Sequence, residues 1–330
     1  MTTTTATAPG KVILFGEHAV VYGRPAIAVP VAKVKATATL TDAPAGTGCT
    51  ITAPDIGAHI RLSSVQQDPL ALAVRLAIEE ACIEADPDWQ FTVQSDIPIA
   101  GGMGSGAAVS AALANAVFTH SGFPAHSRPD AETINRIVYE VEKLHHASPS
   151  GIDNTVVVYA QPVWFVRGQP PQRFEIARPF HLVIADTGIA SSTAAVVSDV
   201  RCTWEKNRER YESIFDNIGE ISAAARQAIA SGDVNALGPL MQENQRLLRQ
   251  INVSSAELER LIAIAEDAGA SGAKLSGAGR GGNLICVVES ETVEKVRKAL
   301  QAGGAVGTVV TQVGSKPRPP QPCSRQSSRK

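Results

Sequence analysis

A glycine-rich stretch in the first third of the chain decides how the rest is read: Ile97-Pro98-Ile99-Ala100-Gly101-Gly102-Met103-Gly104-Ser105-Gly106-Ala107-Ala108. Four glycines fall within six positions, and Ala- and Val-rich sequence typical of a helix follows at once, over 107–120. Glycine lets neighbouring backbone N–H groups turn toward one point, and the first turn of a helix adds unpaired donors and the positive end of its dipole. The stretch therefore predicts an anion site, most naturally for phosphate.

Two better-known phosphate loops fit this stretch less well. The Walker pattern needs a lysine directly after its glycines, and none follows here. Gly102, Gly104 and Ala107 match the looser dinucleotide fingerprint. However, residues 91–96 before it alternate apolar and polar side chains, unlike a buried parallel strand, and no acidic residue follows at the expected distance. A glycine turn that only packs a helix tightly is the remaining alternative.

The composition is that of an ordinary globular protein. The 330 residues are 44% hydrophobic and 19% charged, which allows a large core and favours two domains. The net charge of -2 gives no reason to expect a nucleic acid or an acidic membrane as partner. Five scattered cysteines without a C-x-x-C pair suit a reducing compartment, and there is no leader-like or membrane-spanning apolar segment. We expect a cytoplasmic protein with a small-molecule substrate.

Patterns in the first half predict a sheet covered by helices. Strands are expected over 9–15, 19–23, 26–40, 49–62 (a pair of short strands) and 155–159. Helices are expected over 69–85, 107–120 and 127–146. Residues 1–8 are expected to be disordered.

The second half has an order of its own, and the boundary is placed between residues 178 and 179, giving domains over 9–178 and 179–314. Strands are predicted over 180–186, 273–275, 283–289 and 306–313, and helices over 191–231, 233–250, 254–268 and 291–302. With the extra helices taken as insertions, this is the βαββαβ order of a ferredoxin-like domain. The glycine turn over 276–282 suits a ligand or a flexible hairpin equally well. The Pro- and Ser-rich basic tail over 315–330 is expected to be disordered.

Five polar side chains stand out from this framework. Lys11 heads the first strand, and Glu17 and His18 form a polar corner between two apolar runs. Glu142 lies near the C-terminal end of a predicted helix, where an acidic side chain opposes the helix dipole. Asp153 lies between an isoleucine and a β-branched run, which makes it a candidate buried carboxylate. Taken singly, each also has an ordinary structural explanation.

Four segments, in order along the chain, resemble the motifs of the superfamily of galactokinases, homoserine kinases, mevalonate kinases and phosphomevalonate kinases (GHMP kinases): Pro9–His18, Pro98–Ala108, Ser150–Asn154 and Lys274–Gly279. The resemblance spans residues 8 to about 313. Within the superfamily, residues 10–23 and 148–154 are most similar to the mevalonate kinases. The resemblance implies a two-domain α+β fold. Its N-terminal domain would be ribosomal-protein-S5-like and its C-terminal domain ferredoxin-like, with the active site in the cleft between them.

The resemblance also implies a reaction, ATP-dependent phosphorylation of the 5-hydroxyl of mevalonate in isoprenoid precursor synthesis. By the same resemblance, Asp153 takes the proton of the substrate hydroxyl and Lys11 lies beside it. Glu142 and Ser105 would hold Mg²⁺, and Glu17, His18 and Thr193 would line the substrate pocket. The residues implied to bind ATP are Pro98, Gly101, Gly102, Met103, Gly104, Ser105, Gly106 and Ala107. These residue types suit phosphoryl transfer, which needs a base for the hydroxyl and positive charge for the phosphates.

One position departs from the pattern, because relatives commonly carry a second serine, described as a magnesium ligand, where this chain has Gly106. Ser105 or a water would then take its place. Phosphomevalonate and the mevalonate 3-hydroxyl stay open as alternative acceptors. A non-catalytic binding protein with the same fold would be expected to lack Lys11 or Asp153, and both are present. The sequence leaves the oligomeric state open, with a homodimer as one expectation.

Overall fold

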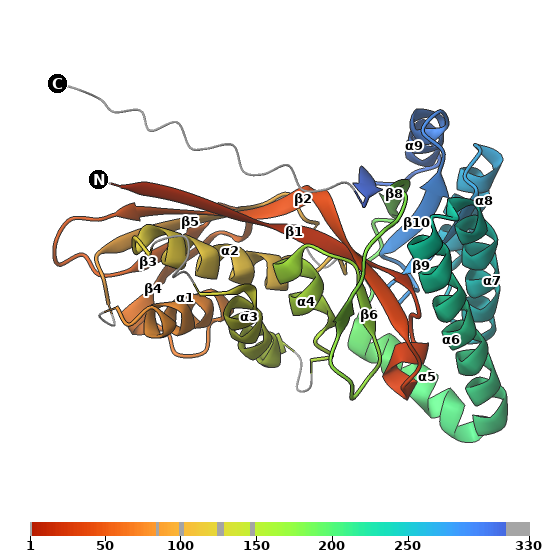
Figure 1. Cartoon of the computed structure of the whole chain (residues 1–330), viewed down its shortest axis with the longest axis horizontal. Helices are drawn as coiled ribbons and strands as arrows, with labels where there is room; N and C mark the ends of the chain where they lie inside the picture. The colour runs from red at the N-terminus through yellow and green to blue at the C-terminus, as the bar shows by residue number, and fades with distance from the viewer. Residues whose placement is uncertain (1, 84–85, 99–101, 124–128, 146–148, 315–330) are drawn as a thin grey trace.

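The computed structural model describes residues 2–83, 86–98, 102–123, 129–145 and 149–314, and it contains two sheets that lie side by side along the long axis of the molecule (Figure 1). The tail predicted over 315–330 lies outside the described residues, and so do residues 99–101 of the glycine-rich stretch. Each sheet carries its own helices, which agrees with the predicted two-part organisation.

The sheet of the N-terminal half has seven strands. They are β1 (Thr3–Phe15), β2 (Ala26–Asp42), β3 (Thr50–Ala53), β4 (Ala58–Arg61), β5 (Trp89–Ser95), β6 (Val163–Phe165) and β7 (Gln172–Arg173). The order is β4-β3-β5-β2-β6-β7, and β1 pairs with β2 along nearly all of its length. Every pair is antiparallel except β3 with β5. The alternation of buried and exposed residues along β2 and β5 fits a sheet with one covered face.

Four helices lie on that covered face: α1 (Pro69–Glu80), α2 (Ser105–His120), α3 (Ala131–His145) and α4 (Ile152–Tyr159) (Figure 1). Helix α2 packs directly on β1, β2 and β5, and α1, α3 and α4 pack around it. Because α2 is rich in alanine, its neighbours can approach closely, and most of its residues are buried. This packing fixes the N-terminal end of α2, where the glycine-rich stretch lies.

The C-terminal half has a four-stranded antiparallel sheet in the order β11-β8-β10-β9. Its strands are β8 (Phe180–Asp186), β9 (Gly272–Ser276), β10 (Asn283–Val288) and β11 (Gly307–Val313). Its helices are α5 (Thr193–Lys206), α6 (Arg208–Ser231), α7 (Leu237–Gln250), α8 (Ala256–Asp267) and α9 (Val293–Ala302). The predicted βαββαβ order is confirmed, with α5 to α8 together in the first crossover. The two halves meet where α6, β9 and β11 contact β1 and β2.

The part of the chain that the structure describes also contains four short 3₁₀ helices: η1 (Ala19–Tyr22), η2 (Pro54–Ile56), η3 (Leu62–Ser64) and η4 (Val234–Ala236). The strand predicted over 19–23 is wrong, because η1 occupies this stretch. Gly16, His18 and Gly23 have φ angles of 97°, 60° and 85°, and such left-handed residues interrupt an extended chain.

Two further predictions from the sequence are wrong, and in both the conformation that the local sequence favours is not the one that forms. The N-terminal segment predicted to be disordered is the first half of β1, where Thr3 pairs with Thr41 and Ala8 with Ala36. The β-branched run over 155–159 is helical because Gly151 begins α4 in a left-handed conformation and Val156 and Val157 are buried in the core. Tertiary packing outweighs strand propensity there.

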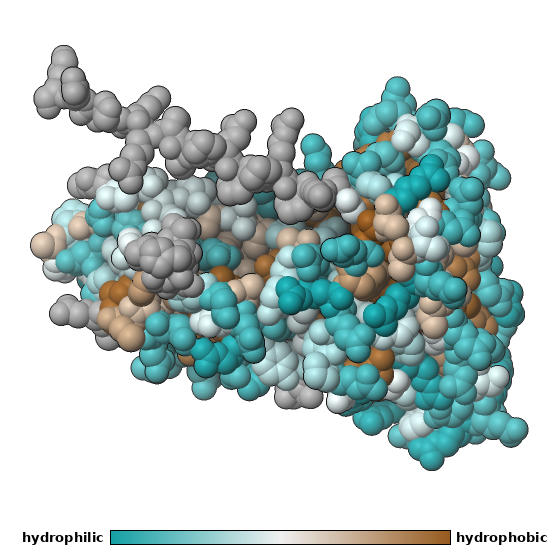
Figure 2. Space-filling model, in the orientation of Figure 1, coloured by the Kyte–Doolittle hydropathy of each residue, from teal (hydrophilic) through white to brown (hydrophobic). Residues whose placement is uncertain are grey.

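Helix α1 is shorter than the pattern over 69–85 predicts. It ends at Glu80, and Cys82 then adopts a left-handed φ of 53°. The boundary between residues 178 and 179 falls between strands of different sheets, β7 and β8, and stays a prediction. On the face seen in Figure 2, hydrophilic residues predominate and apolar ones occur in small patches. Within the described residues, no helix is both long and apolar enough to cross a membrane.

Candidate active site

Lys11 and Asp153 form the centre of the candidate site. Lys11 comes from β1 and is 5% exposed, and Asp153 lies in the first turn of α4. Lys11 Nζ lies 2.9 Å from Asp153 Oδ1, so the structure brings together the two residues that the resemblance placed side by side. The two side chains form an ion pair.

The glycine-rich stretch passes directly over the side chain of Lys11. The Lys11 backbone N–H donates to the Met103 carbonyl at 2.9 Å. Gly104 has a left-handed φ of 72°, and a Cβ built on it would lie 2.9 Å from Lys11 Cγ. A larger residue at 104 would therefore be strained and would press on the lysine. The position needs glycine for both reasons.

The remaining residues of the predicted phosphate loop surround this contact. Gly102 also has a left-handed φ, of 68°, and Met103 is buried. Ser105 begins α2, so the N–H groups of 105–107 belong to a first helical turn, which has no intrahelical acceptors for them. Gly106 is exposed and has no positive φ, and Ala107 is buried. Pro98 follows β5 and is partly buried, while Gly101 lies outside the described residues.

Glu142 adds a second carboxylate to the centre. It lies on α3 and is buried, and its pKa is raised to about 7 by burial and then by the negative charge of Asp153, while Lys11 opposes the shift. Two carboxylates and one ammonium group therefore share this region. The hard oxygen donors of the two carboxyl groups suit a divalent cation.

The polar corner between β1 and η1 faces the C-terminal half. Glu17 is fully buried, and its Oε1 accepts a hydrogen bond from Lys274 Nζ of β9. The His18 ring Nε2 lies 2.9 Å from the Ala278 carbonyl oxygen, and because a carbonyl only accepts, Nε2 carries the proton. Burial lowers the pKa of His18 to about 4, so the ring is neutral at pH 7 and Nδ1 is an acceptor.

Thr193 is linked to this corner through the contacts of its neighbour Ser191. It is the first residue of α5 and is exposed. Ser191 Oγ donates to the Gly279 carbonyl at 2.6 Å, and the neighbouring Ala278 is the partner of His18. The turn after β9 therefore connects the start of α5 to the polar corner at Glu17 and His18. The sequence left this turn open between a ligand contact and a plain hairpin.

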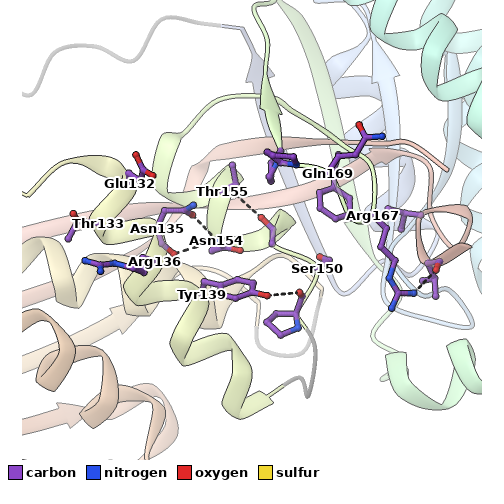
Figure 3. Close-up of a pocket in the computed structure, with 18 of the residues that line it drawn as sticks. Glu132, Thr133, Asn135, Arg136, Tyr139, Ser150, Asn154, Thr155, Arg167 and Gln169 are labelled. Carbon is purple, nitrogen blue, oxygen red and sulfur yellow. Dashed lines mark hydrogen bonds between the residues drawn. The ribbon is translucent and has the colours of Figure 1, made fainter. Parts of the chain in front are cut away.

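A cavity lies beside α4, whose residues Asn154 and Thr155 line it (Figure 3). It has a volume of about 1120 Å³, with residues of α3 such as Arg136 and Tyr139 on one side and Arg167 and Gln169 on the other. Lys11, Asp153 and Glu142 are not among the described residues that line it. The next residue of α4, Asn154, does line it and donates to Asn135 Oδ1 at 2.8 Å. The cavity is therefore lined by the residues next to Asp153 in α4 and not by the Lys11–Asp153 pair itself.

One residue of the site had no role in the sequence prediction. Lys274 stands in the fourth matching segment, but nothing in the sequence shows that its side chain reaches Glu17. A lysine inside a short apolar strand is the only signal, and it becomes informative once the strand is known to be buried.

Comparisons with known proteins identify the family of this chain. The model of the GHMP kinases N terminal domain matches residues 70–161, and that of the GHMP kinases C terminal region matches 225–306. Mevalonate kinases of Pyrococcus horikoshii and Aeropyrum pernix are each 33% identical to this chain, over 91% and 88% of it and 92% and 90% of their own length. The chain belongs to the mevalonate kinase family of the GHMP kinases. As a GHMP kinase it uses ATP.

Solved mevalonate kinases have the same fold. The L. major enzyme in complex with R-mevalonate has a TM-score of 0.82 and 29% identity, over 94% of this chain and 96% of that one. The Methanococcus jannaschii enzyme has a TM-score of 0.81 at 23% identity, over 96% and 99%. The two-domain GHMP kinase fold that the motifs implied is thereby confirmed.

Proposed function

We propose that this member of the mevalonate kinase family transfers the γ-phosphoryl group of ATP to the 5-hydroxyl of mevalonate. The observation that carries the proposal is the Lys11–Asp153 pair, with its 2.9 Å contact beneath the glycine-rich stretch at the start of α2. The choice of mevalonate is supported by the names of the relatives and by the R-mevalonate bound to the L. major enzyme.

Asp153 acts as the general base in this proposal. The 5-hydroxyl oxygen forms a bond to the γ-phosphorus, the bond from that phosphorus to the β,γ-bridging oxygen breaks, and ADP leaves. The hydroxyl proton goes to the Asp153 carboxylate. Lys11 lies 2.9 Å from Asp153 and balances negative charge as the alkoxide meets phosphorus.

The phosphates are bound by the loop and by the first turn of α2. Their proposed partners are Pro98, Gly101, Gly102, Met103, Gly104, Ser105, Gly106 and Ala107, mainly through backbone N–H groups. Glu142 and Ser105 would hold Mg²⁺, which when bound neutralises phosphate charge. Within the described residues, no cluster of three or more His, Cys, Asp or Glu side chains could cage a metal. That suits Mg²⁺, which commonly takes one or two protein carboxylates together with phosphates and water.

The substrate side is formed by Glu17, His18 and Thr193. Neutral His18 offers an acceptor at Nδ1, and the buried Glu17 carboxylate offers another, so both suit the hydroxyl groups of a small alcohol. The start of α5 presents the hydroxyl groups of Ser191, Ser192 and Thr193 and no charge, which favours mevalonate over a phosphorylated substrate.

An ADP-release assay with mevalonate, phosphomevalonate, homoserine and galactose tests the proposal. We expect turnover with mevalonate, loss of two to four decades in kcat in the folded Asp153→Asn variant, and a ³¹P NMR spectrum of the product that shows 5-phosphorylation. Preferred turnover of phosphomevalonate, or a product phosphorylated at the 3-hydroxyl, would contradict it. The cytoplasmic location, the homodimer and the domain boundary stay predictions of the sequence.

A further inference from the structure

Three contacts join the N-terminal corner to the C-terminal sheet, and they involve every second residue of one short stretch. Lys274 Nζ donates to Glu17, Ser276 Oγ donates to the Ile13 carbonyl at 2.8 Å, and the Ala278 carbonyl accepts from His18 at 2.9 Å. We call residues 13–18 and 274–278 together the clasp. Two of the three contacts end on residues of the proposed substrate pocket.

The Lys274–Glu17 pair differs from the other two contacts because both charges are completely buried. Each side chain has 0% exposed surface. Lys274 Nζ has a second acceptor, the Leu275 carbonyl at 2.6 Å, whereas Glu17 Oε2 has no hydrogen-bond partner among the described residues. A buried ion pair contributes little net stability, because desolvation offsets the attraction between its charges. Stability therefore does not explain a buried carboxylate oxygen left without a donor.

We propose that Lys274 is a positioning residue that holds Glu17 as a carboxylate, so that Glu17 Oε2 accepts a hydrogen bond from a hydroxyl of the alcohol substrate. The inference rests on the proposed function, and it adds a residue of the C-terminal domain to the alcohol pocket. Lys274 acts through Glu17 and touches no substrate atom itself.

The charges around Glu17 show why Lys274 is needed. Burial raises the pKa of Glu17, and two cations oppose that shift, Lys274 of β9 first and Lys11 of β1 second. Lys11 is already engaged by Asp153 at 2.9 Å. Loss of Lys274 would remove the larger of these two opposing charges, so burial would raise the pKa of Glu17 further and favour its protonated form. A protonated carboxyl cannot serve as the same charged acceptor.

The kinetic test compares Lys274→Met, Glu17→Gln and the double variant with wild type. Loss of a hydrogen bond to a charged group predicts a KM for mevalonate about tenfold higher in each single variant, with kcat and the KM for ATP within about threefold of wild type. Because both changes remove the same acceptor, the double variant should have the KM of a single one. Ser276→Ala is the matched control, since it removes a neighbouring clasp contact without removing a charge, and its KM should stay near wild type.

The pH dependence separates positioning from simple packing. In Lys274→Met, a rise in pH from 6 to 9 favours the Glu17 carboxylate and should lower the KM toward the wild-type value, whereas Glu17→Gln has no such group and should keep its high KM. An unchanged KM in Lys274→Met, an additive double variant, or equal pH courses in the two single variants would overturn the proposal.

Thermal unfolding gives a readout that does not depend on turnover. A buried carboxyl with a raised pKa binds a proton in the folded state that the unfolded state has released, so the Tm of Lys274→Met should fall with rising pH relative to the double variant. Parallel Tm curves would refute control of Glu17 by Lys274, even if wild type proved inactive on mevalonate and the proposed function failed. If Lys274→Met does not fold, the double variant must match the KM of Glu17→Gln, and a further increase would overturn the proposal.

Discussion

His18 predicts how the stability of the protein depends on pH in acid. Its pKa is about 4 in the folded protein and 6.5 in the unfolded chain, because burial excludes the imidazolium and the positive charges of Arg280 and Lys274 add to the effect. Below pH 6.5 the unfolded state therefore binds a proton that the folded state does not, so the free energy of unfolding decreases as the pH falls toward 4. At 1.36 kcal/mol for each pKa unit, the loss is about 1 kcal/mol at pH 5.5 and about 3 kcal/mol at pH 4.

The variant His18→Gln isolates this contribution. Glutamine keeps an N–H donor for the Ala278 carbonyl and does not titrate, while every other ionisable group is common to the two proteins. Urea unfolding at pH 7.5, 5.5 and 4 gives the two free energies. The variant is expected to be less stable at pH 7.5, because His18 has a φ of 60° and glutamine must fit the same backbone, but its deficit should shrink by about 3 kcal/mol at pH 4. Parallel curves for the two proteins would show that His18 is not held neutral by burial.

Four other substitutions test the site. Gly104→Ala should lower kcat at least tenfold because its Cβ would meet Lys11, whereas Gly102→Ala, with a similar φ and nothing within 4 Å, is the matched control and should retain more activity. Lys11→Met should lower kcat by two to four decades while circular dichroism stays unchanged, and near wild-type turnover would remove Lys11 from the mechanism. Glu142→Gln should raise the Mg²⁺ concentration for half-maximal activity about tenfold or more, and Gly106→Ser should lower it, because Gly106 has no positive φ and can accept a side chain. A magnesium titration that shows no change in either variant would contradict the proposed metal site.

The sequence was sufficient for features that depend on nearby residues. The alanine-rich run of α2, the glycines before it and the βαββαβ order of the second half were all predicted, because helix periodicity and glycine conformation are local properties. The sequence pattern gave wrong predictions where contacts between residues far apart in the chain determine the local structure. Thr3–Ala8 are ordered because the long strand β2 offers them a partner, and residues 155–159 are helical because the core takes Val156 and Val157.

In the candidate site, too, the sequence indicated the residue types but not the contacts between distant segments. Motif resemblance placed Lys11 beside Asp153, and the structure has that contact. The raised pKa of Glu142 and the Lys274–Glu17 pair could not be predicted, because both depend on burial and on contacts between segments far apart in sequence. A motif identifies the residue types that the chemistry needs. It does not show which of their oxygen atoms lack a hydrogen-bond donor in the folded protein.

The clasp also determines when during its synthesis the protein becomes able to bind an alcohol. Glu17 and Lys274 are 257 positions apart, and at the usual rate of roughly 5–20 residues per second the ribosome needs on the order of 10–50 s to travel from one to the other. Until then a charged Glu17 lacks its main counter-ion, and Lys11 is engaged by Asp153, so the corner after β1 must stay hydrated or take up a proton. The Lys11–Asp153 pair needs only the first half of the chain. A nascent chain can thus form its phosphate loop and its base early, and its alcohol pocket is completed only when β9 arrives.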